Sequence, residues 1–365
     1  MPQQIFGSNG GPSMKHLSKA LLLSAAACAL AGQAQANETV NIGACVSWPS
    51  YAMTQLAQSA GLVEGYDFNV TIFEDPLGGH AALAAGQIDV YGCTADYIPV
   101  AADAGLNVAN VAFLTPSYGV DHIILAGGIE AKNLPGKKIA APQAYIGHLQ
   151  MGLWLDSQGI APDQVEWVNL NADEAVGPML SGDLAAAYMY EPWISRVLAS
   201  SPGSRSVANT AEAASLKTGI FMDSLFMNKD FIANRREAAL AVLKAEFDGR
   251  AYWSANVEAA NQQIADFLQW SVEDVVSVIG DNGKALEGGT YTMDFDESAR
   301  FCGALEGEPP FGTANGSMVA TAKLTNEWWI KLGLLSKEAD VASAIDCSLM
   351  SDLAKSGYRS AFSAK

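Results

Sequence analysis

Short apolar runs alternate with amphipathic stretches over most of the chain, and this alternation is the main structural signal in the sequence. From residue 40 it predicts strands at 40–45, 68–73 and 88–91, separated by helices at 49–59 and 79–85. The alternation restarts after Gly127, where we expect strands at 138–141, 165–169 and 185–189 and helices at 147–158 and 174–180. Strands that alternate with helices form parallel, doubly wound sheets, so the pattern predicts two similar α/β units at residues 40–126 and 127–222.

The hydrophobic pattern changes after residue 231. Residues 235–270 and 318–356 are predicted to form long helices, and residues 280–292 and 303–316 are predicted loops. Helices that follow two α/β units would pack onto one of them and brace it. The sequence contains no repeat of fixed period, no Walker A motif, no nucleophile elbow and no GxGxxG motif, so none of these motifs supports a nucleotide-binding or hydrolase function.

The first 36 residues carry the features of a secretory signal in the usual order. Lys15 and Lys19 form a positive segment, residues 21–30 are apolar, and residues 34–36 (AQA) have the small-x-small pattern that signal peptidase cuts. The apolar run is too short to span a bilayer comfortably. We therefore expect a periplasmic mature chain that begins near Asn37.

Two points about this segment are left open by the sequence. Translation could start at Met1 or at Met14, because residues 1–13 add nothing to the signal. Anchoring as a lipoprotein through Cys28 is the less favoured alternative, since residues 24–27 lack the usual leucine.

Composition and charge narrow the class of protein. The 365 residues carry a net charge of −18, and the predicted signal contributes only two lysines and no acid, so the mature part is more acidic still. An acidic surface repels nucleic acid and anionic lipid, so we expect no nucleic-acid partner, and solubility is the ordinary explanation of such a charge. Half of the residues are hydrophobic, which is ample for a core, and roughly 330 mature residues indicate two domains.

Four of the five cysteines fall in the mature chain, and an even count in an oxidising compartment permits two disulfides. Cys302 and Cys347 are the favoured pair, because both lie in the C-terminal third. Cys45 and Cys93 are either a second pair or buried thiols at strand ends. The spacing of the four fits no zinc motif.

Several segments resemble one family of proteins. They are residues 81–97 (AALAAGQIDVYGCTADY), 133–142 (NLPGKKIAAP), 154–193 (from WLDSQGIAPDQVEWVNL to AAAYMYEPW) and 222–245 (MDSLFMNKDFIANRREAALAVLKA). The family is that of the periplasmic binding proteins of ABC importers for taurine and aliphatic sulfonates, the nitrate/sulfonate/taurine or NMT1-like family. The resemblance covers nearly the whole mature chain and implies import of a solute, without saying which one.

The resemblance also implies a fold and an organisation. The fold is an α/β fold of the type II periplasmic binding proteins, with two doubly wound lobes joined by a two-segment hinge and extra C-terminal helices. We expect a signal peptide at 1–36, lobe I at 37–126 and 225–365, and lobe II at 127–224. Ligand would bind between the lobes, hinge closure would bury it, and an ABC permease would read the closed state. We expect a monomer that is not an enzyme and carries no cofactor.

Ligands of open α/β sheets lie outside the carboxyl ends of the strands, so we expect the binding residues in the loops that follow the strands. The candidates are Trp48, His80, Thr94, Tyr118, Asp121, Tyr145, His148, Tyr190, Glu191, Trp193 and Asp223. Ser50, Tyr51, Gly79, Asp96 and His122 lie in the same loops. Aromatic residues would wall the ligand, the acids Asp121, Glu191 and Asp223 would hold its positive end, and His80, Thr94 and His148 would orient its polar end.

The charges in these loops favour a cationic group on the ligand. Residues 37–195 contain no arginine, and their only lysines are Lys132, Lys137 and Lys138, so no arginine fork can hold an anion. Residues 144–146 (AYI) replace the Ser/Thr run that sulfonate-type members carry. Acids beside aromatic rings suit a cation, and Asp223 occupies the place where taurine-type members hold an amino group.

We therefore predict an amine-bearing or zwitterionic solute such as taurine, with a quaternary ammonium or a pyrimidine of the thiamine-precursor type as alternatives. Three further hypotheses are weaker. A metal could bind His80, His122 and His148, but these lack the spacing of a local metal site. The iron-dependent pyrimidine synthase of this fold carries a cysteine-rich cluster that this sequence lacks. A role as a periplasmic sensor module is the third.

Overall fold

The computed structural model describes residue 7 and residues 36–359, which fall into two compact units, 1–37 and 38–365. The features of the predicted signal, including Cys28, lie almost entirely outside the described residues. All that follows concerns the second unit. Among the described residues, no helix is both long and apolar enough to cross a membrane.

The first of two β-sheets has six strands in the order β11-β4-β10-β3-β1-β2. β1 pairs in parallel with β2 and β3, whereas β10 runs antiparallel to β3 and β4. The strands are β1 (Glu38–Cys45), β2 (Tyr66–Phe73), β3 (Val90–Thr94), β4 (Val108–Tyr118), β10 (Met222–Asn228) and β11 (Gly289–Thr290). We call this sheet and its helices lobe I.

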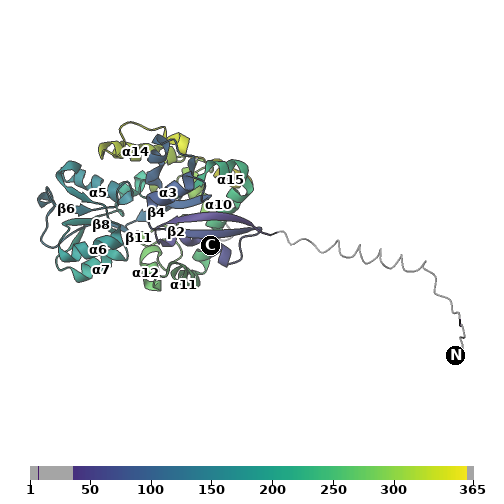
Figure 1. Cartoon of the computed structure of the whole chain (residues 1–365), viewed down its shortest axis with the longest axis horizontal. Helices are drawn as coiled ribbons and strands as arrows, with labels where there is room; N and C mark the ends of the chain where they lie inside the picture. Colours follow the sequence, from purple (N-terminus) through teal and green to yellow (C-terminus); the bar gives the residue numbers. More distant parts are fainter. Residues whose placement is uncertain (1–6, 8–35, 360–365) are drawn as a thin grey trace, which may run out of the picture. The chain divides into compact units, whose positions relative to one another are not determined.

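The second sheet has five strands in the order β7-β6-β8-β5-β9, and with its helices it forms lobe II (Figure 1). Its strands are β5 (Asp121–Leu125), β6 (Lys138–Ala140), β7 (Glu166–Val168), β8 (Ala186–Tyr190) and β9 (Arg205–Asn209). β6 lies parallel to β7 and β8, and β5 is antiparallel to both of its neighbours. The strands expected at 138–141, 165–169 and 185–189 are all present with slightly shifted ends.

The chain changes sheet at different residues from those expected. It leaves the first sheet after Tyr118 and enters the second at Asp121, before the expected limit at residue 126. It returns through residues 210–221, and β10 is already part of lobe I at Met222. Both crossings therefore lie directly beside Asp121 and Asp223, two of the predicted ligand residues.

Helices cover both sheets. Lobe I carries α2 (Met53–Ser59), α3 (Pro76–Ala84) and α4 (Ile98–Asp103), preceded by short 3-10 turns at Pro49–Ala52 and Ala95–Tyr97. Lobe II carries α5 (Ile146–Ser157), α6 (Ala172–Ser181) and α7 (Trp193–Ser200), and α8 (Ala213–Thr218) lies on the return crossing. The remaining helices are α9 (Lys229–Asn234), α10 (Arg236–Ala255), α11 (Val257–Leu268), α12 (Val272–Ile279), α13 (Phe295–Phe301), α14 (Met318–Lys331) and α15 (Ser348–Lys355).

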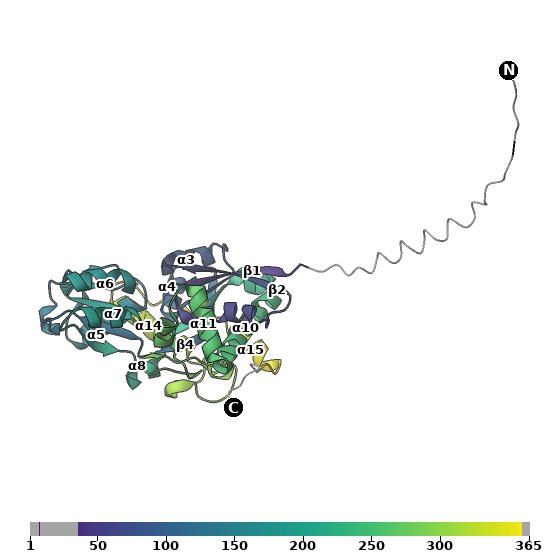
Figure 2. The same ribbon diagram turned by 90° about the horizontal axis from the view of Figure 1, so that it is seen from below.

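The C-terminal part is more broken than the hydrophobic pattern predicts. The helix expected over 235–270 is interrupted at Asn256, and the one expected over 318–356 is wrong as a single element. α14 ends at Lys331, since Gly333 adopts a left-handed conformation (φ 76°) and turns the chain away. α14 packs against α4 of lobe I and α5 of lobe II, as Figure 2 shows, so this helix contacts both lobes.

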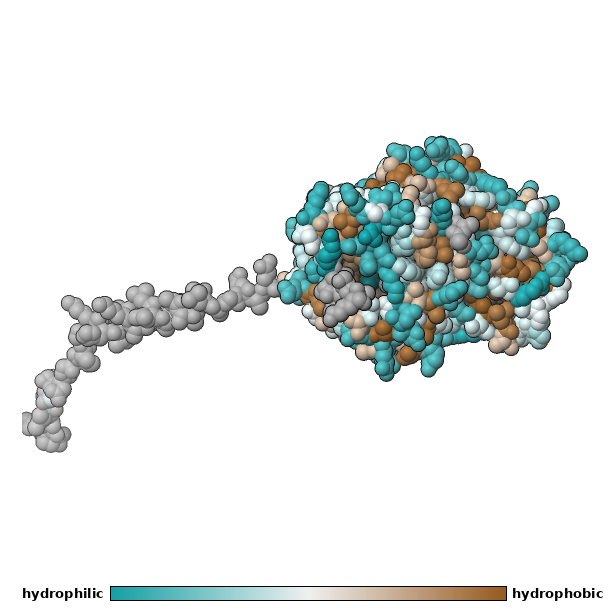
Figure 3. Space-filling view, turned by 180° about the vertical axis from the view of Figure 1, so that it is seen from behind, coloured by the Kyte–Doolittle hydropathy of each residue, from teal (hydrophilic) through white to brown (hydrophobic). Residues whose placement is uncertain are grey.

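Both pairs of cysteines form disulfides, Cys45–Cys93 and Cys302–Cys347. The favoured pairing of Cys302 with Cys347 is confirmed. The alternative of buried free thiols for Cys45 and Cys93 is wrong, because β1 and β3 are neighbours in the sheet and bring these two residues together near their ends. Hydrophilic residues are spread widely over the face shown in Figure 3, in keeping with the acidic composition.

Candidate functional site

A narrow cavity lies between the two sheets, and the space within it that is open to water-sized molecules is about 30 Å³. Lobe I contributes residues at the ends of β1, β3 and β4 and at the start of β10. Lobe II contributes residues from β5, β8 and the start of α5. The lining residues are Val46, Trp48, Thr94, Thr115, Ser117, Val120, Asp121, Tyr145, Ile146, Tyr188, Tyr190, Phe221, Met222, Asp223 and Thr290.

Asp223 is the acidic residue on the lobe I side. It lies near the start of β10, paired with Thr94 on β3 and Thr115 on β4, so the sheet fixes its backbone. Its Oδ2 accepts a hydrogen bond from Trp48 Nε1 at 3.1 Å, and its Oδ1 accepts one from the Tyr51 hydroxyl at 2.8 Å. Burial raises the pKa of Asp223 to about 6, although these two hydrogen bonds favour the ionised form.

Asp121 is the acidic residue on the lobe II side. It begins β5 opposite Tyr190, and the Tyr188 hydroxyl donates a hydrogen bond to its Oδ1. Gln150 Nε2 donates to the Asp121 carbonyl at 2.9 Å and holds the backbone at this point. Burial raises the pKa of Asp121, whereas the nearby hydroxyls of Ser117 and Tyr188 lower it.

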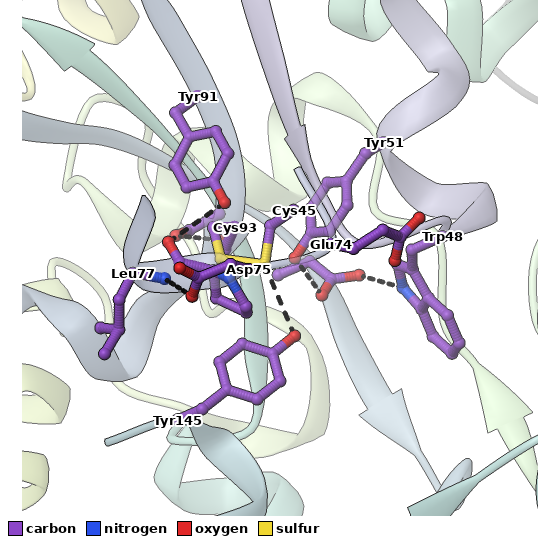
Figure 4. The surroundings of a disulfide bond; sticks show 12 residues. Cys45, Trp48, Tyr51, Glu74, Asp75, Leu77, Tyr91, Cys93 and Tyr145 are labelled. Carbon is purple, nitrogen blue, oxygen red and sulfur yellow. Dashed lines mark hydrogen bonds between the residues drawn. A yellow bond between two sulfur atoms is a disulfide. The ribbon is translucent and has the colours of Figure 1, made fainter. Parts of the chain in front are cut away.

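Aromatic rings form much of the wall. The Trp48 ring meets Tyr190 edge to face, with 5.2 Å between centroids, and Tyr188 lies 6.0 Å from Tyr190. The Tyr145 hydroxyl points toward the Cys45–Cys93 disulfide, 3.6 Å from Cys45 Sγ, as Figure 4 shows. Because a disulfide sulfur carries no hydrogen, Tyr145 is the donor in this contact. Trp48–Tyr190 and Cys45–Tyr145 both join lobe I to lobe II across the cavity.

The cavity is acidic. None of the described residues that line it is a lysine, arginine or histidine. Arg250 lies behind Thr115 and donates to its Oγ1 at 2.9 Å, but Arg250 is itself paired with buried Glu246. The charge of Asp121 raises the pKa of Asp223 further, which shows that the two carboxylates interact. A bound cation would relieve this repulsion.

Six of the predicted ligand residues line the cavity together. They are Trp48, Thr94, Asp121, Tyr145, Tyr190 and Asp223. Tyr51, which lies in one of the same loops, contributes a hydrogen bond to Asp223 rather than part of the wall. These residues come from strand-end loops of both lobes, where the sequence placed them.

Both predicted histidine ligands lie elsewhere. His80 faces the interior of lobe I from α3, stacked on Tyr97 at 3.5 Å, and burial lowers its pKa well below the usual value. His148 is half-buried and packs against Trp167 of lobe II at 4.6 Å, beside the end of α14, and burial lowers its pKa to about 4. In both cases the helix turns the side chain toward its own lobe instead of the cavity. His122 likewise points away, with Nδ1 bonded to Ser206, and the described residues hold no cluster of three or more potential metal ligands.

The other three predicted residues also lie outside the cavity. Tyr118 packs against Phe311 at 5.4 Å. Glu191 accepts hydrogen bonds from the backbone and hydroxyl of Ser195 and so caps the first turn of α7. Trp193 begins α7, with the Arg196 guanidinium 4.3 Å above its ring. The sequence places these three residues in or beside strand-end loops but does not give the direction of their side chains.

Some lining residues were not predicted. Tyr188 was available from the sequence, because it lies two residues before Tyr190 and therefore on the same face of β8. Ser117 and Thr115 share a strand that the pattern did not predict. Thr290 comes from β11, which pairs with β4 from far along the chain, and no local signal indicates it.

Comparison with known sequences places the chain in a family of binding proteins. The model of the NMT1-like family matches residues 33–269. A protein of Brucella abortus (strain 2308), named as a candidate binding protein, is 25% identical over 256 residues, covering 68% of this chain and 77% of its own. The taurine-binding periplasmic protein of Escherichia coli (strain K12) is 23% identical over 248 residues, covering 67% of this chain and 73% of its own.

Solved structures share the fold. The alkanesulfonate-binding protein SsuA of Xanthomonas axonopodis pv. citri, bound to MOPS, matches with a TM-score of 0.66 at 16% identity, covering 85% of this chain and 99% of its own. The nitrate-binding protein NrtA of Synechocystis PCC 6803 matches with a TM-score of 0.66 at 14% identity, covering 88% and 89%. The expected fold of a type II periplasmic binding protein is thereby confirmed. The desulfurization enzyme DSZB has the same fold (TM-score 0.57, 14% identity, covering 88% and 100%), so the fold alone does not exclude catalysis.

Proposed function

The chain belongs to the NMT1-like family as a substrate-binding component of an ABC import system, and we propose that its solute is a small molecule with a positively charged amine, taurine-like zwitterions included. The solute would occupy the cavity between the lobes, with its positive group beside Asp121 and Asp223. Such a protein binds and releases its solute and delivers it to a membrane permease, without catalysis.

The observation that carries this proposal is the acidity of the cavity, which Arg250 behind Thr115 offsets only in part because it is paired with Glu246. Asp121 and Asp223 are 7% and 9% exposed, and none of the described lining residues neutralises them. Keeping ionised carboxylates out of water is expensive unless they are paired. A ligand with a positive charge supplies the pairing, and rings such as Trp48 and Tyr190 add cation–π attraction.

A second feature, the contact between the lobes around the cavity, fits capture by closure. At one contact between the lobes, Arg196 of α7 in lobe II pairs with Asp274 of α12 at 3.3 Å. At a second contact, Asn171 Nδ2 of lobe II donates a hydrogen bond to the Glu74 carbonyl of lobe I at 3.3 Å. These contacts can form only when the lobes approach each other, so a ligand that draws Asp121 and Asp223 together would favour them.

The proposal includes export and assembly. The signal features of residues 1–36 would direct the chain to the periplasm, where the oxidising environment suits both disulfides. We expect the mature protein to be a monomer that contacts the permease when its lobes are closed.

The test is a thermal-shift and calorimetric screen of the protein purified after export. The panel holds amines (taurine, ethanolamine, glycine betaine) and simple anions (nitrate, sulfate, methanesulfonate). We expect only compounds with a positive group to raise the melting temperature. A panel in which the simple anions alone stabilised the protein would overturn the proposal, and native mass spectrometry of the purified protein would identify any solute carried through.

A further inference from the structure

Carboxylates stand on two sides of the cavity, and both can accept more hydrogen bonds. Asp121 belongs to β5 of lobe II and Asp223 to β10 of lobe I. An ionised carboxylate accepts about four hydrogen bonds. Asp121 receives one from Tyr188 and also interacts with the Ser117 hydroxyl, and Asp223 receives one each from Trp48 and Tyr51. A ligand between them therefore meets acceptors that point from both lobes.

The walls between these carboxylates are largely aromatic. Trp48, Tyr145, Tyr188 and Tyr190 present rings to the cavity, and each of them is buried. The Thr94 hydroxyl also lines the cavity, 5% exposed, and it lies beside the buried carboxyl of Asp96, where it opposes the rise in pKa that burial causes. The cavity thus offers acceptors in several directions between aromatic surfaces.

Cationic head groups differ in how well they match such walls. A quaternary ammonium has no N–H group and would leave the acceptors of Asp121 and Asp223 unused. A primary ammonium has three donors around one strongly hydrated nitrogen and no flat face. A guanidinium or amidinium is planar, directs paired N–H groups outward in its plane, stacks on aromatic rings and is more weakly hydrated, so its burial costs less.

Building on the proposed function, we propose that the positive group of the solute is a planar guanidinium or amidinium whose edges bind Asp121 of lobe II and Asp223 of lobe I at once. The head group then lies between the aromatic rings with its charge shared by the two carboxylates. This arrangement also makes the ligand a bridge between the lobes, since each lobe supplies one of the acids.

Matched pairs of compounds that differ only in the head group test the inference. Isothermal titration calorimetry at pH 7.5 compares methylguanidine with methylamine, and 2-guanidinoethanesulfonate with taurine, at concentrations far below those that denature. We expect the guanidino member of a pair to bind at least about tenfold more tightly, because a second charge-assisted contact is added. Urea, the neutral isostere of guanidinium, should not bind.

The outcomes separate this inference from the proposed function. If the amine bound as tightly as its guanidino partner in both pairs, the planar head group would be wrong and the proposed function would stand. If no compound of either pair bound, or if urea bound as tightly as methylguanidine, both the planar head group and the proposed function would be wrong. These measurements use the unaltered protein and do not depend on the folding of any variant.

Substitutions then test whether one head group reaches both acids. Asp121→Asn and Asp223→Asn should each weaken methylguanidine binding by at least about tenfold. Asp248→Asn is the matched control, because Asp248 is also buried and accepts a hydrogen bond from a tyrosine, Tyr358, at 2.8 Å, but does not line the cavity. Asp248→Asn should leave the affinity unchanged. Loss of affinity in only one of the two cavity variants, with both folded by circular dichroism, would contradict the bridging arrangement.

Discussion

Replacing Asp223 by asparagine separates the role of this residue in stability from its role in binding. Burial raises the Asp223 pKa from 3.8 to about 6, which corresponds to roughly 3 kcal/mol against the ionised form in the folded protein at neutral pH. Asp223→Asn removes that penalty. It also places an amide NH₂ opposite one of the two donors, Trp48 or Tyr51, which costs about 1–3 kcal/mol.

The two terms nearly cancel, so the free energy of unfolding of the ligand-free variant should stay within about 2 kcal/mol of the parent. Binding should behave differently, because the ligand loses a charge-assisted hydrogen bond worth about 1.5–3 kcal/mol, or about 10–150-fold in affinity. Urea denaturation measures the first quantity, and calorimetry with methylguanidine or taurine measures the second.

Two results would refute the reasoning. A variant that bound these compounds with unchanged affinity would show that Asp223 does not hold the positive group. A ligand-free variant destabilised by well over 3 kcal/mol would show that the ionised carboxylate stabilises the fold, contrary to the raised pKa of Asp223.

Three other predictions follow from the same contacts. Protonation of Asp223 should weaken binding of a cationic compound by up to about tenfold per pH unit below pH 6, whereas affinity should be level above pH 7, and a flat calorimetric profile from pH 5 to 8 would contradict this. Replacing Cys302 and Cys347 together by serine should lower the free energy of unfolding, measured in urea, by up to about 4 kcal/mol and leave the ligand affinity unchanged, because this disulfide lies away from the cavity. The same change at Cys45 and Cys93 should lower both the stability and the affinity, since their disulfide ties together the strand ends that carry Trp48 and Thr94. Arg196→Ala should weaken ligand binding by less than about fivefold, because the ion pair of Arg196 with Asp274 is exposed, and the difference in affinity from the parent should disappear in 1 M salt. A difference in affinity that persists in 1 M salt would contradict this role of Arg196.

Most of the secondary structure of lobe II could be predicted because its strands are short apolar runs between turn residues. β6, β7 and β8 lie where the pattern placed them, and α5 and α6 follow their strands as expected. β4 was missed although its residues are almost all buried, because a strand that is buried on both faces shows no regular alternation of apolar and polar residues. The long C-terminal helix failed for a different reason, since Gly333 stops α14 by a backbone conformation that hydrophobic periodicity does not reveal.

In the candidate site, too, some residues could be predicted from the sequence and others could not. Asp121 and Asp223 could be nominated because they stand at strand ends beside the crossings, and strand ends of such sheets face the ligand. His80 and Glu191 satisfied the same criterion. Their side chains are nevertheless turned by α3 and α7 into contacts with Tyr97 and Ser195. The position of a residue at a strand end can therefore be predicted from the sequence, and the direction of its side chain cannot.

By itself the sequence determined that two α/β units are joined in one chain, that their strand-end loops are rich in acids and aromatic residues, and that arginine is absent from residues 37–195. These properties depend on local composition and periodicity. Only the tertiary structure decided which acids share the cavity, that Thr290 reaches it through β11, and that Cys45 pairs with Cys93. Those facts depend on which strands become neighbours, and contacts between residues far apart in the chain are set by the packing of the whole sheet and leave no local pattern.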